Sequence, residues 1–290
     1  MVVVWDYPTS FKDQRIMARE TFKIGNPDYP PVFLNVDNSQ LRVVSTDYLY
    51  QIAEGNISGH EAWVNFGYSG TVGTGETDIW SKTGVYAFPG SAIQMAVSSS
   101  AAGDSSAGTG VRTVHVHYLD GNFVENVGTV TMDGTALVPT AGTNIYRINR
   151  VEVATVGTYG KAVGAISVTG TAGTVFYDHI SAGYLQSRNS AYTVPAGKTL
   201  YVVSVRGAYG HSSNQPEYGR LLFYATVNHS GVKSPGMFFG FGESMSDNTT
   251  IPIDLVIPFK VPEKCDIKVS CIASAAGIAN VALRGWLETD

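Results

Sequence analysis

From about residue 88 onward, apolar and polar residues alternate with a period of two, and this pattern restricts the chain to β structure. The run VHVHY, residues 114–118, alternates strictly, which places its valines and histidines on opposite faces of a strand. Runs of this kind, separated by clusters of Gly, Asp, Asn or Ser, continue to about residue 186: AIQMAVSSS, VRTVHVHYL, FVENVGTVTM, NIYRINRVEVATV, KAVGAISVT and GTVFYDHI. Strands at this spacing indicate a sandwich or a barrel.

A second series of strands begins near Tyr192 and reaches the end of the chain. Its segments are YTVPAGKTLYVVSVRGAY, RLLFYATVN, GMFFGFGE, IPIDLVIPFKVPEKCDIKVSCIA and ANVALRGWLE. Pro195 and Pro262 are expected where a strand begins, because a missing N–H breaks no interior ladder there. The similar sequences VPAGK and VPEKC are expected to form equivalent corners. We therefore predict an all-β fold with two β-sandwich, jelly-roll-like units, residues 88–187 and 188–290.

Residues 1–87 are predicted to form a less regular N-terminal segment, rich in Pro, Asp, Asn and aromatic residues. A short helix is expected to begin at Ser10 and to end before Gly25. PPVFLNV and QLRVV are expected to be strands, whereas residues 47–52 fit either a helix or a strand.

The composition argues against several functional classes. Charged residues make up 15% of the chain, well below the usual quarter. The net charge is −5 and the basic residues are scattered, so nucleic acid is not an expected partner. No run of about 18 apolar residues predicts a membrane span, and the N-terminus does not resemble a secretory signal. Synthesis in a cytoplasm is expected.

The two cysteines, Cys265 and Cys271, are expected to remain reduced structural thiols. Six residues along a strand separate their Cα atoms by about 20 Å, which is too far for a disulfide between them.

His115 and His117 raise the question of a metal or catalytic site. Two histidines spaced i, i+2 on a strand can both reach a metal, but the pair lacks the further ligand that zinc needs. We predict an exposed strand face instead, followed by a hairpin turn at residues 120–122. In that register His117 faces Glu125, and His115 faces Val127.

No other segment predicts a catalytic, cofactor-binding or metal-binding residue. SGTVGTGETD, residues 69–78, lacks the Gly-Lys-Ser/Thr ending of a phosphate loop and is expected to be a flexible surface loop. SAAGDSSAGTG, residues 100–110, is expected to be an unreactive loop. The segment 211–218 is the most plausible contact loop.

Acidic and aromatic side chains are the candidates for glycan chemistry. Glycan cleavage needs two carboxylates at a fixed distance, and the acids in question are dispersed: Asp78, Glu125, Glu152, Asp178, Glu217 and Asp254. Aromatic residues could stack on sugars if exposed, although core packing is their commoner use: Trp63, Tyr68, Trp80, Tyr209 and Tyr218. We expect no enzymatic activity and no cofactor.

Several motifs between residues 85 and 290 resemble virion proteins of tailed bacteriophages, particularly phages of aquatic bacteria. The shared features are a Ser-rich loop followed by Gly-Thr-Gly-x-Arg-Thr at 108–113, Leu-Asp-x-Asn-aromatic at 119–123, Thr-Val-Thr-x-x-Gly-Thr at 129–135, Arg-x-Asn-Arg at 147–150, YTVPAGKT and IPFKVPEKCDIKV. The family often has residues other than His at positions 115 and 117.

This resemblance implies a non-enzymatic structural component of a virion, made in the host cytoplasm. A capsid decoration or cement protein is the leading interpretation, with the major capsid protein or other virion subunits as partners and a homo-oligomer as the expected state. The alternative is a host-recognition module of a tail fibre or baseplate that binds surface glycans. Residues 1–87 are the expected attachment segment, since a stretch poorly patterned for its own core can order on binding.

Overall fold

The structure is a computed structural model of the 290-residue chain. It describes residues 22–24, 32–37, 40–45, 48–211, 217–226, 228–229, 232–233, 237–246 and 250–289. The chain divides into two units, Met1–Ile57 and Ser58–Asp290. The helices among the described residues include none long and apolar enough to cross a membrane.

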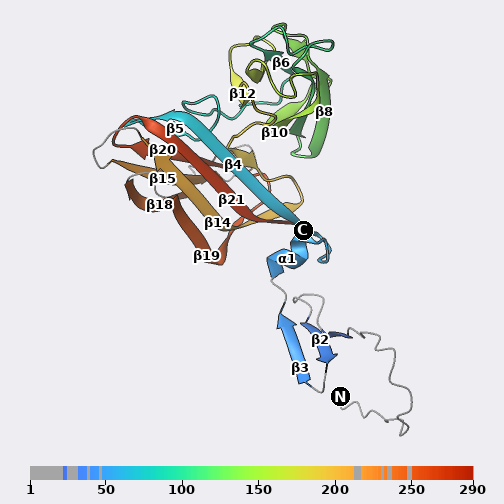
Figure 1. The fold of residues 1–290 in the computed structure, drawn as a ribbon, viewed down its shortest axis with the longest axis vertical. Coiled ribbons are helices and arrows are strands. Elements are labelled where there is room, and N and C mark those ends of the chain that lie inside the picture. The colour runs from blue at the N-terminus through green and yellow to red at the C-terminus, as the bar shows by residue number, and fades with distance from the viewer. Residues whose placement is uncertain are drawn as a thin grey trace. The chain divides into compact units, whose positions relative to one another are not determined.

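The N-terminal unit contains a small antiparallel sheet and one short helix (Figure 1). The strands β1 (Phe22–Ile24), β2 (Val32–Asp37) and β3 (Gln40–Ser45) are ordered β1-β2-β3, and α1 spans Tyr48–Ala53. The two predicted strands are confirmed, and the ambiguous segment 47–52 is largely helical. The helix expected after Ser10 lies mostly outside the described residues, and its last part is wrong because β1 pairs there with β2.

Eight strands of the second unit form a sandwich of two antiparallel sheets. They are β4 (His60–Val72), β5 (Thr77–Asp78), β14 (Lys198–Gly210), β15 (Tyr218–Thr226), β18 (Met237–Ser246), β19 (Thr250–Val261), β20 (Asp266–Ala273) and β21 (Gly277–Thr289). One sheet has the order β19-β14-β21-β4, and the other has β18-β15-β20, with β5 and the additional short strand β13 (Tyr192–Thr193) both paired to the far edge of β20. With these strands numbered one to eight along the chain, the orders are 6-3-8-1 and 5-4-7-2, the arrangement of a jelly roll.

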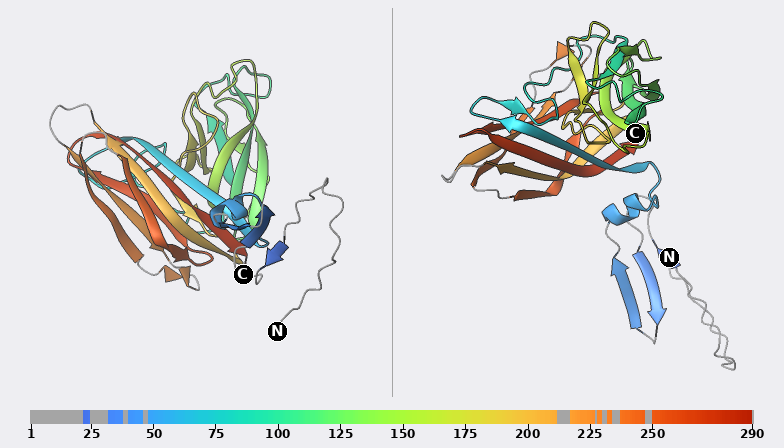
Figure 2. Two further views of the ribbon diagram at one scale, coloured as in Figure 1. Left: turned by 60° about the horizontal axis from the view of Figure 1, so that its bottom comes forward. Right: turned by 45° about the horizontal axis from the view of Figure 1, so that its top comes forward.

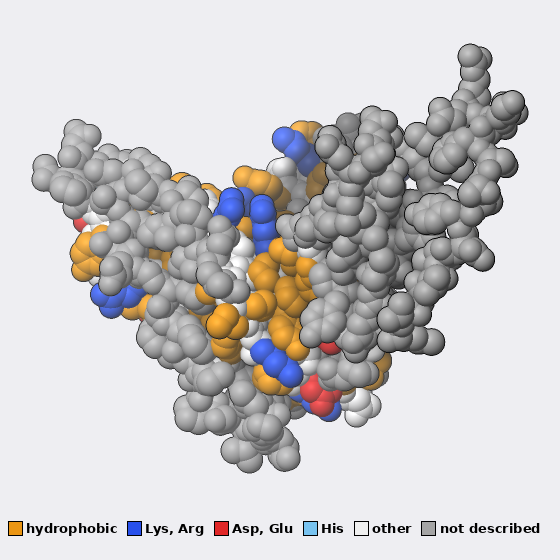
Figure 3. Space-filling model, turned by 90° about the horizontal axis from the view of Figure 1, so that it is seen from below, with side chains coloured by type: hydrophobic (Ala, Val, Ile, Leu, Met, Phe, Trp, Pro, Cys, Tyr) orange, Lys and Arg blue, Asp and Glu red, His pale blue; other side chains and the backbone are white. Residues whose placement is uncertain are grey.

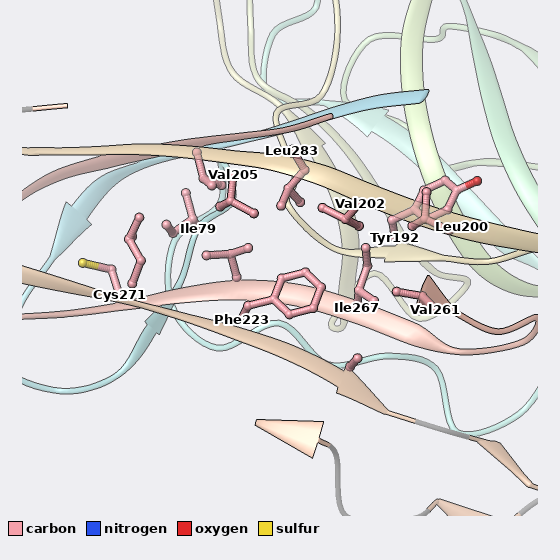
Figure 4. Close-up of a cluster of buried hydrophobic side chains, with 14 of the residues drawn as sticks. Ile79, Tyr192, Leu200, Val202, Val205, Phe223, Val261, Ile267, Cys271 and Leu283 are labelled. Carbon is pink, nitrogen blue, oxygen red and sulfur yellow. The ribbon is translucent and has the colours of Figure 1, made fainter. Parts of the chain in front are cut away.

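The core of this jelly roll lies between its two sheets (Figure 4). Alternate residues of each strand point inward, so Val202 and Leu283 come from one sheet, while Phe223, Ile267 and Cys271 come from the other. Burial of a Val, Leu, Ile or Phe side chain contributes roughly 1.5–3 kcal/mol, and this core has more than a dozen such residues. Both cysteines are buried.

A second sandwich is inserted between β5 and β14, the second and third strands of the jelly roll. Its strands are β6 (Met95–Ser99), β7 (Val111–Asp120), β8 (Glu125–Thr131), β9 (Val138–Pro139), β10 (Ile145–Val156), β11 (Ile166–Gly170) and β12 (Phe176–Ile180). Their sheets, β10-β7-β8 and β12-β11-β6-β9, enclose a hydrophobic cluster of their own. Figure 2 shows these strands, coloured green to yellow, as one body. We call it the inserted sandwich.

Two linkers connect the inserted sandwich to the jelly roll. The incoming linker comprises residues 79–94, and the outgoing linker comprises residues 181–191, followed by β13 (Tyr192–Thr193). Trp80 pairs with Asn189 in an antiparallel bridge, and Ser190 N–H donates to Ile79 O at 3.0 Å. The two linkers therefore run side by side where they leave the jelly roll.

The predicted boundary at residue 87 differs from the observed division after Ile57. β4 pairs with the last strand of the chain, β21, and β5 pairs with β20. Residues 60–78 therefore supply two of the eight jelly-roll strands, which the sequence pattern assigned to the irregular segment. The flexible-loop prediction for residues 69–78 is likewise wrong at both ends, which belong to β4 and β5.

The two Pro-containing turns are equivalent corners, although neither proline opens a strand. Pro262 follows the end of β19, and Pro195 lies between β13 and β14. The fourth residue of each turn, Gly197 or Lys264, has a left-handed backbone with φ of 71° or 60°. Lys264 N–H donates to Val194 O at 2.8 Å, so the corners also contact each other.

The two-stranded ribbon β16 (Asn228–His229) and β17 (Val232–Lys233) completes the described strands.

Candidate interaction site

A fully buried ion pair joins the inserted sandwich to the jelly roll. Arg147 of β10 donates to both carboxylate oxygens of Asp266 on β20, with Nε–Oδ1 at 2.7 Å and Nη2–Oδ2 at 2.9 Å. The Arg147 side chain is 0% exposed and that of Asp266 is 4% exposed. Burial opposes the charge of Arg147, but the hydrogen bonds and charge of Asp266 hold its pKa above the usual value. This bidentate geometry fixes one orientation of the two bodies.

The Nη1 group of Arg147 is also satisfied. Its Nη1 donates to the carbonyl oxygens of Pro89 and Tyr146, each at 2.9 Å. The guanidinium lies near three aromatic rings, those of Phe88, Tyr146 and Phe123. A buried charge with a full set of partners is stable, whereas the same charge with a partner removed is costly.

Phe123 explains why the predicted hairpin register is wrong. It adopts a left-handed backbone with φ of 64° and buries its ring against Tyr146. Its carbonyl oxygen accepts a hydrogen bond from Ala196 N–H of the jelly roll at 2.9 Å. The β7–β8 loop is therefore four residues long, 121–124, and the register shifts by two residues from the one predicted.

In the observed register His117 pairs with Val127, and His115 pairs with Thr129. Both histidines lie on the face of β7 away from the core and are half-buried. His117 Nε2 lies 3.0 Å from Glu152 Oε1 of β10, in place of the predicted Glu125. Among the described residues no group of three His, Cys, Asp or Glu side chains is placed to hold a metal. The absence of a metal or catalytic role remains a prediction.

A groove lies between the edge strands of the two sandwiches. Both β4 and β8 end their sheets. They border a cavity of about 280 Å³ with these lining residues: Glu61 to Asn65 of β4, His117 to Leu119 of β7, Glu125 to Val127 of β8, and Asn149, Arg150, Tyr192 and Leu287. Val64 and Val127 are highly exposed, at 60% and 59%. An edge strand presents backbone N–H and C=O groups that can pair with a further chain.

Lys198 bridges the two walls of this groove. Its Nζ lies 3.1 Å from Glu61 Oε2 of β4 and 2.6 Å from Glu125 Oε2 of β8. Burial opposes the ammonium charge, but the two carboxylates raise the pKa of Lys198. Two partly exposed carboxylates facing one ammonium leave this end of the groove acidic.

The other acids considered in the sequence are engaged singly or in structural networks. Asp78 pairs with Lys268 and is buried. Glu152 contacts His117 and Arg150, and although burial opposes it, these contacts lower its pKa. Glu217 accepts a hydrogen bond from Ser274. The side chain of Asp254 lies outside the described part.

Three of the five aromatic residues considered for sugar stacking are core residues. Trp63, Trp80 and Tyr209 are buried. Tyr68 is half-buried, with the Arg188 guanidinium 4.1 Å from its ring centroid, and Tyr218 is 48% exposed. Most of the contact loop proposed at 211–218 lies outside the described residues.

The Ser-rich loop 100–110 contains a buried aspartate that sequence reasoning missed. Asp104 is 0% exposed and accepts hydrogen bonds from Ser99 Oγ and from the N–H groups of Val111, Val163 and Gly164. Glycines on both sides of Asp104 were a signal, because they let backbone approach closely. A Cβ on Gly110 would collide with the Asp104 carboxylate.

Exposed apolar side chains are numerous on this unit. Figure 3 shows a face on which hydrophobic side chains form a patch with Lys and Arg side chains beside it. The described residues include sixteen exposed large hydrophobics, with Val85 and Ile257 the most exposed. Surfaces of this kind commonly mark contacts with other proteins.

Comparisons with known proteins show only a weak structural likeness. No protein-family model matches the chain, and no curated protein sequence matches it. Similar solved structures include the VP2 subviral particle of infectious bursal disease virus, with 10% identity, a TM-score of 0.22, and coverage of 79% of this chain and 76% of that chain. A structure of the Gx strain of the same virus has 9% identity, a TM-score of 0.22, and coverage of 80% and 77%. Likenesses with so low a TM-score carry no argument, so the fold assignment depends on the strand order.

Proposed function

We propose that this protein is a non-enzymatic structural component of a bacteriophage virion, located on the capsid as a decoration or cement protein. The observation that carries the proposal is the jelly roll with its inserted sandwich, bound together by the buried Arg147–Asp266 pair. Jelly rolls are common in viral capsid and lectin domains. The phage-like motifs at 108–150 all fall in the inserted sandwich, which favours a virion role.

Attachment to neighbouring capsid subunits is proposed to use two regions. The first is the N-terminal unit, residues 1–57, which forms a compact unit of its own. The second is the groove between β4 and β8, whose edge strands and exposed Val64 and Val127 suit an extended segment of a neighbouring subunit. Symmetric repetition of weak contacts then gives a stable shell, with self-association as a homo-oligomer.

Cryo-electron microscopy of intact particles tests the role directly. Density that fits the two sandwiches should repeat over the capsid surface. Density confined to the tail would support the alternative below, and absence of the protein from purified particles would refute both proposals.

Co-sedimentation with particles that lack this protein tests the attachment regions. A variant without residues 1–57 should keep a cooperative thermal transition but fail to sediment with particles. Val64→Asp combined with Val127→Asp should weaken attachment, whereas Val85→Asp, at an exposed valine outside the groove, should not. Unchanged attachment of the deletion variant and of the groove variant would contradict the proposed role of both regions in attachment.

The alternative is a host-recognition module of a tail fibre or baseplate that binds surface glycans. The groove favours it through a second property: amide, carboxylate and guanidinium groups lie beside aromatic side chains there, as Asn126, Glu125, Arg150 and Tyr118. Glycan-array binding that Glu125→Gln or Arg150→Ala abolishes would support this alternative. A cement protein should bind no glycan on the array.

A further inference from the structure

A lysine, an aspartate and a glutamate gather on one face of the sheet at β5 and β20. Asp78 is the register partner of Ser270, and Lys268 lies two residues before Ser270 on the same face. The Nζ atom of Lys268 is 2.9 Å from Oδ2 of Asp78. Glu76 lies two residues before Asp78, and its Oε1 accepts a hydrogen bond from Ser270 Oγ at 2.9 Å.

The surroundings of Asp78 favour the uncharged form of its carboxyl group. The Asp78 side chain is 3% exposed, and its Oδ1 has no hydrogen-bond partner among the described residues. Burial raises the pKa of Asp78; the Lys268 ammonium and the Tyr86 N–H oppose the rise, and the charge of Glu76 adds to it. Tyr224 is the register partner of Lys268, and the centroid of its ring lies 5.5 Å from Lys268 Nζ. Burial therefore makes the Asp78 carboxyl easier to protonate than an exposed one, and only a protonated carboxyl can release its Oδ2 as water.

We propose that Lys268 and Asp78 condense to form an intramolecular isopeptide bond, with Glu76 as the proton shuttle. The Lys268 ammonium gives a proton to Asp78 Oδ2 across their hydrogen bond. The neutral Nζ then attacks Cγ of Asp78, and Glu76 carries a second proton from the nitrogen to Oδ2. The Cγ–Oδ2 bond breaks, one water leaves, and an Nζ–Cγ amide remains. No oxidant, reductant or co-reactant is required.

The fold supplies what this reaction needs from a protein. Two reacting groups fixed in contact react as if present at an effective concentration of about 10⁵–10⁸ M, which favours condensation over the separated groups. β5 is only two residues long, and Asp78 ends it directly before the incoming linker. The amide would therefore tie the start of that linker covalently to β20. This inference does not depend on the proposed virion role.

Intact-mass measurement of the denatured full-length protein tests the proposal. The wild-type chain should be lighter than its sequence mass by one water molecule, and peptide mapping should find Asp78 and Lys268 in one branched peptide. Lys268→Arg keeps the positive charge but cannot form the amide, so its measured mass should equal its sequence mass. A wild-type chain at its full sequence mass, even after long incubation of the folded protein, would overturn the proposal.

Two further variants separate this bond from other sources of water loss. Lys198→Arg changes a lysine that also contacts carboxylates, and it should keep the mass deficit. Glu76→Gln should slow bond formation by about 10²-fold or more, the usual contribution of general acid–base catalysis. A mass deficit that persists in Lys268→Arg would place the lost water elsewhere and would refute the assignment.

Discussion

The Ser-rich loop 100–110 and the strand β12 each contain a buried aspartate of the inserted sandwich, Asp104 and Asp178, and the two carboxylates have contrasting surroundings. Asp104 accepts four hydrogen bonds, one from a hydroxyl and three from backbone N–H groups. Asp178 Oδ1 accepts from His179 N–H at 2.9 Å and from Asn189 Nδ2 at 3.3 Å, while its Oδ2 has no partner among the described residues.

The pKa values follow this difference. Burial alone would raise the pKa of Asp104, but its hydrogen bonds outweigh burial and lower it. At Asp178 burial dominates and raises the pKa to about 7. The comparison teaches that burial raises the pKa of a carboxylate and hydrogen-bond donors lower it, and that the balance of the two decides whether it is ionised at neutral pH. Asp266 is a third case, in which a buried cation supplies the donors.

The largest loss of folding stability is expected when Asp266 loses its partner Arg147. Arg147→Met leaves Asp266 buried without its cation, and loss of one partner of a buried pair costs about 3–5 kcal/mol. Chemical denaturation at pH 7 should show this loss in the free energy of unfolding. The double variant Arg147→Met with Asp266→Leu should recover much of it, because no charge then remains unpaired. Equal stability of the single variant and the wild type would contradict the role of the pair.

Asp104→Ala should cost about 3 kcal/mol, since it leaves backbone donors of Val111, Val163 and Gly164 without an acceptor. The same denaturation experiment measures it. Asp133→Ala offers a control on an exposed aspartate of the neighbouring turn, and it should change stability little. A cost below about 1 kcal/mol would mean that water or other groups replace the carboxylate.

Asp178→Asn should stabilise the protein at pH 8, on the order of 1–3 kcal/mol. The folded state of the wild type keeps the proton up to about pH 7, whereas the unfolded state loses it near the ordinary value of 3.8. The stability that this group contributes is therefore complete below about pH 4 and is lost as the pH rises toward 7. Thermal melts from pH 5 to pH 8 should decline less in the variant; an unchanged slope would show that Asp178 ionises normally.

The smallest change in stability is expected at the partly exposed pair of His117 and Glu152. Its atoms lie 3.0 Å apart, but both side chains are partly exposed. His117→Ala should therefore change the free energy of unfolding by less than about 1 kcal/mol. A double-mutant cycle with Glu152→Ala measures the coupling, and a coupling above about 2 kcal/mol would place this pair with the buried ones.

The all-β fold and most strand positions could be predicted because alternation is a local property. The strands β6 to β8, β10 to β12, β14, β15 and β18 to β21 fall on the predicted runs, whereas β9 and the ribbon of β16 and β17 were not predicted. The identity of the jelly-roll partners is not local: β4 pairs with β21 at the opposite end of the chain. No pattern in residues 60–72 predicts β21 as the partner of β4. The sequence therefore placed the domain boundary at residue 87, although the observed division falls after Ile57.

The candidate site was less predictable for a related reason. Arg147 and Asp266 come from different sandwiches, and the sequence around each residue does not show that the two form an ion pair. Phe123 was treated as a strand residue, although burial of its ring at the junction sets the length of the β7–β8 loop. The face of β7 that carries His115 and His117 could be predicted, because side-chain direction follows from alternation alone.

The pairing of Trp80 with Asn189 has a consequence for how such a chain can be rebuilt. Because the incoming and outgoing linkers are hydrogen-bonded neighbours, the chain leaves the jelly roll and returns to it at nearly one point. The roughly one hundred residues beyond that point, which form the inserted sandwich, can be exchanged for a short turn or for a different domain. The strand order of the jelly roll does not change. The jelly roll is then a constant scaffold, and the domain inserted into it can be replaced.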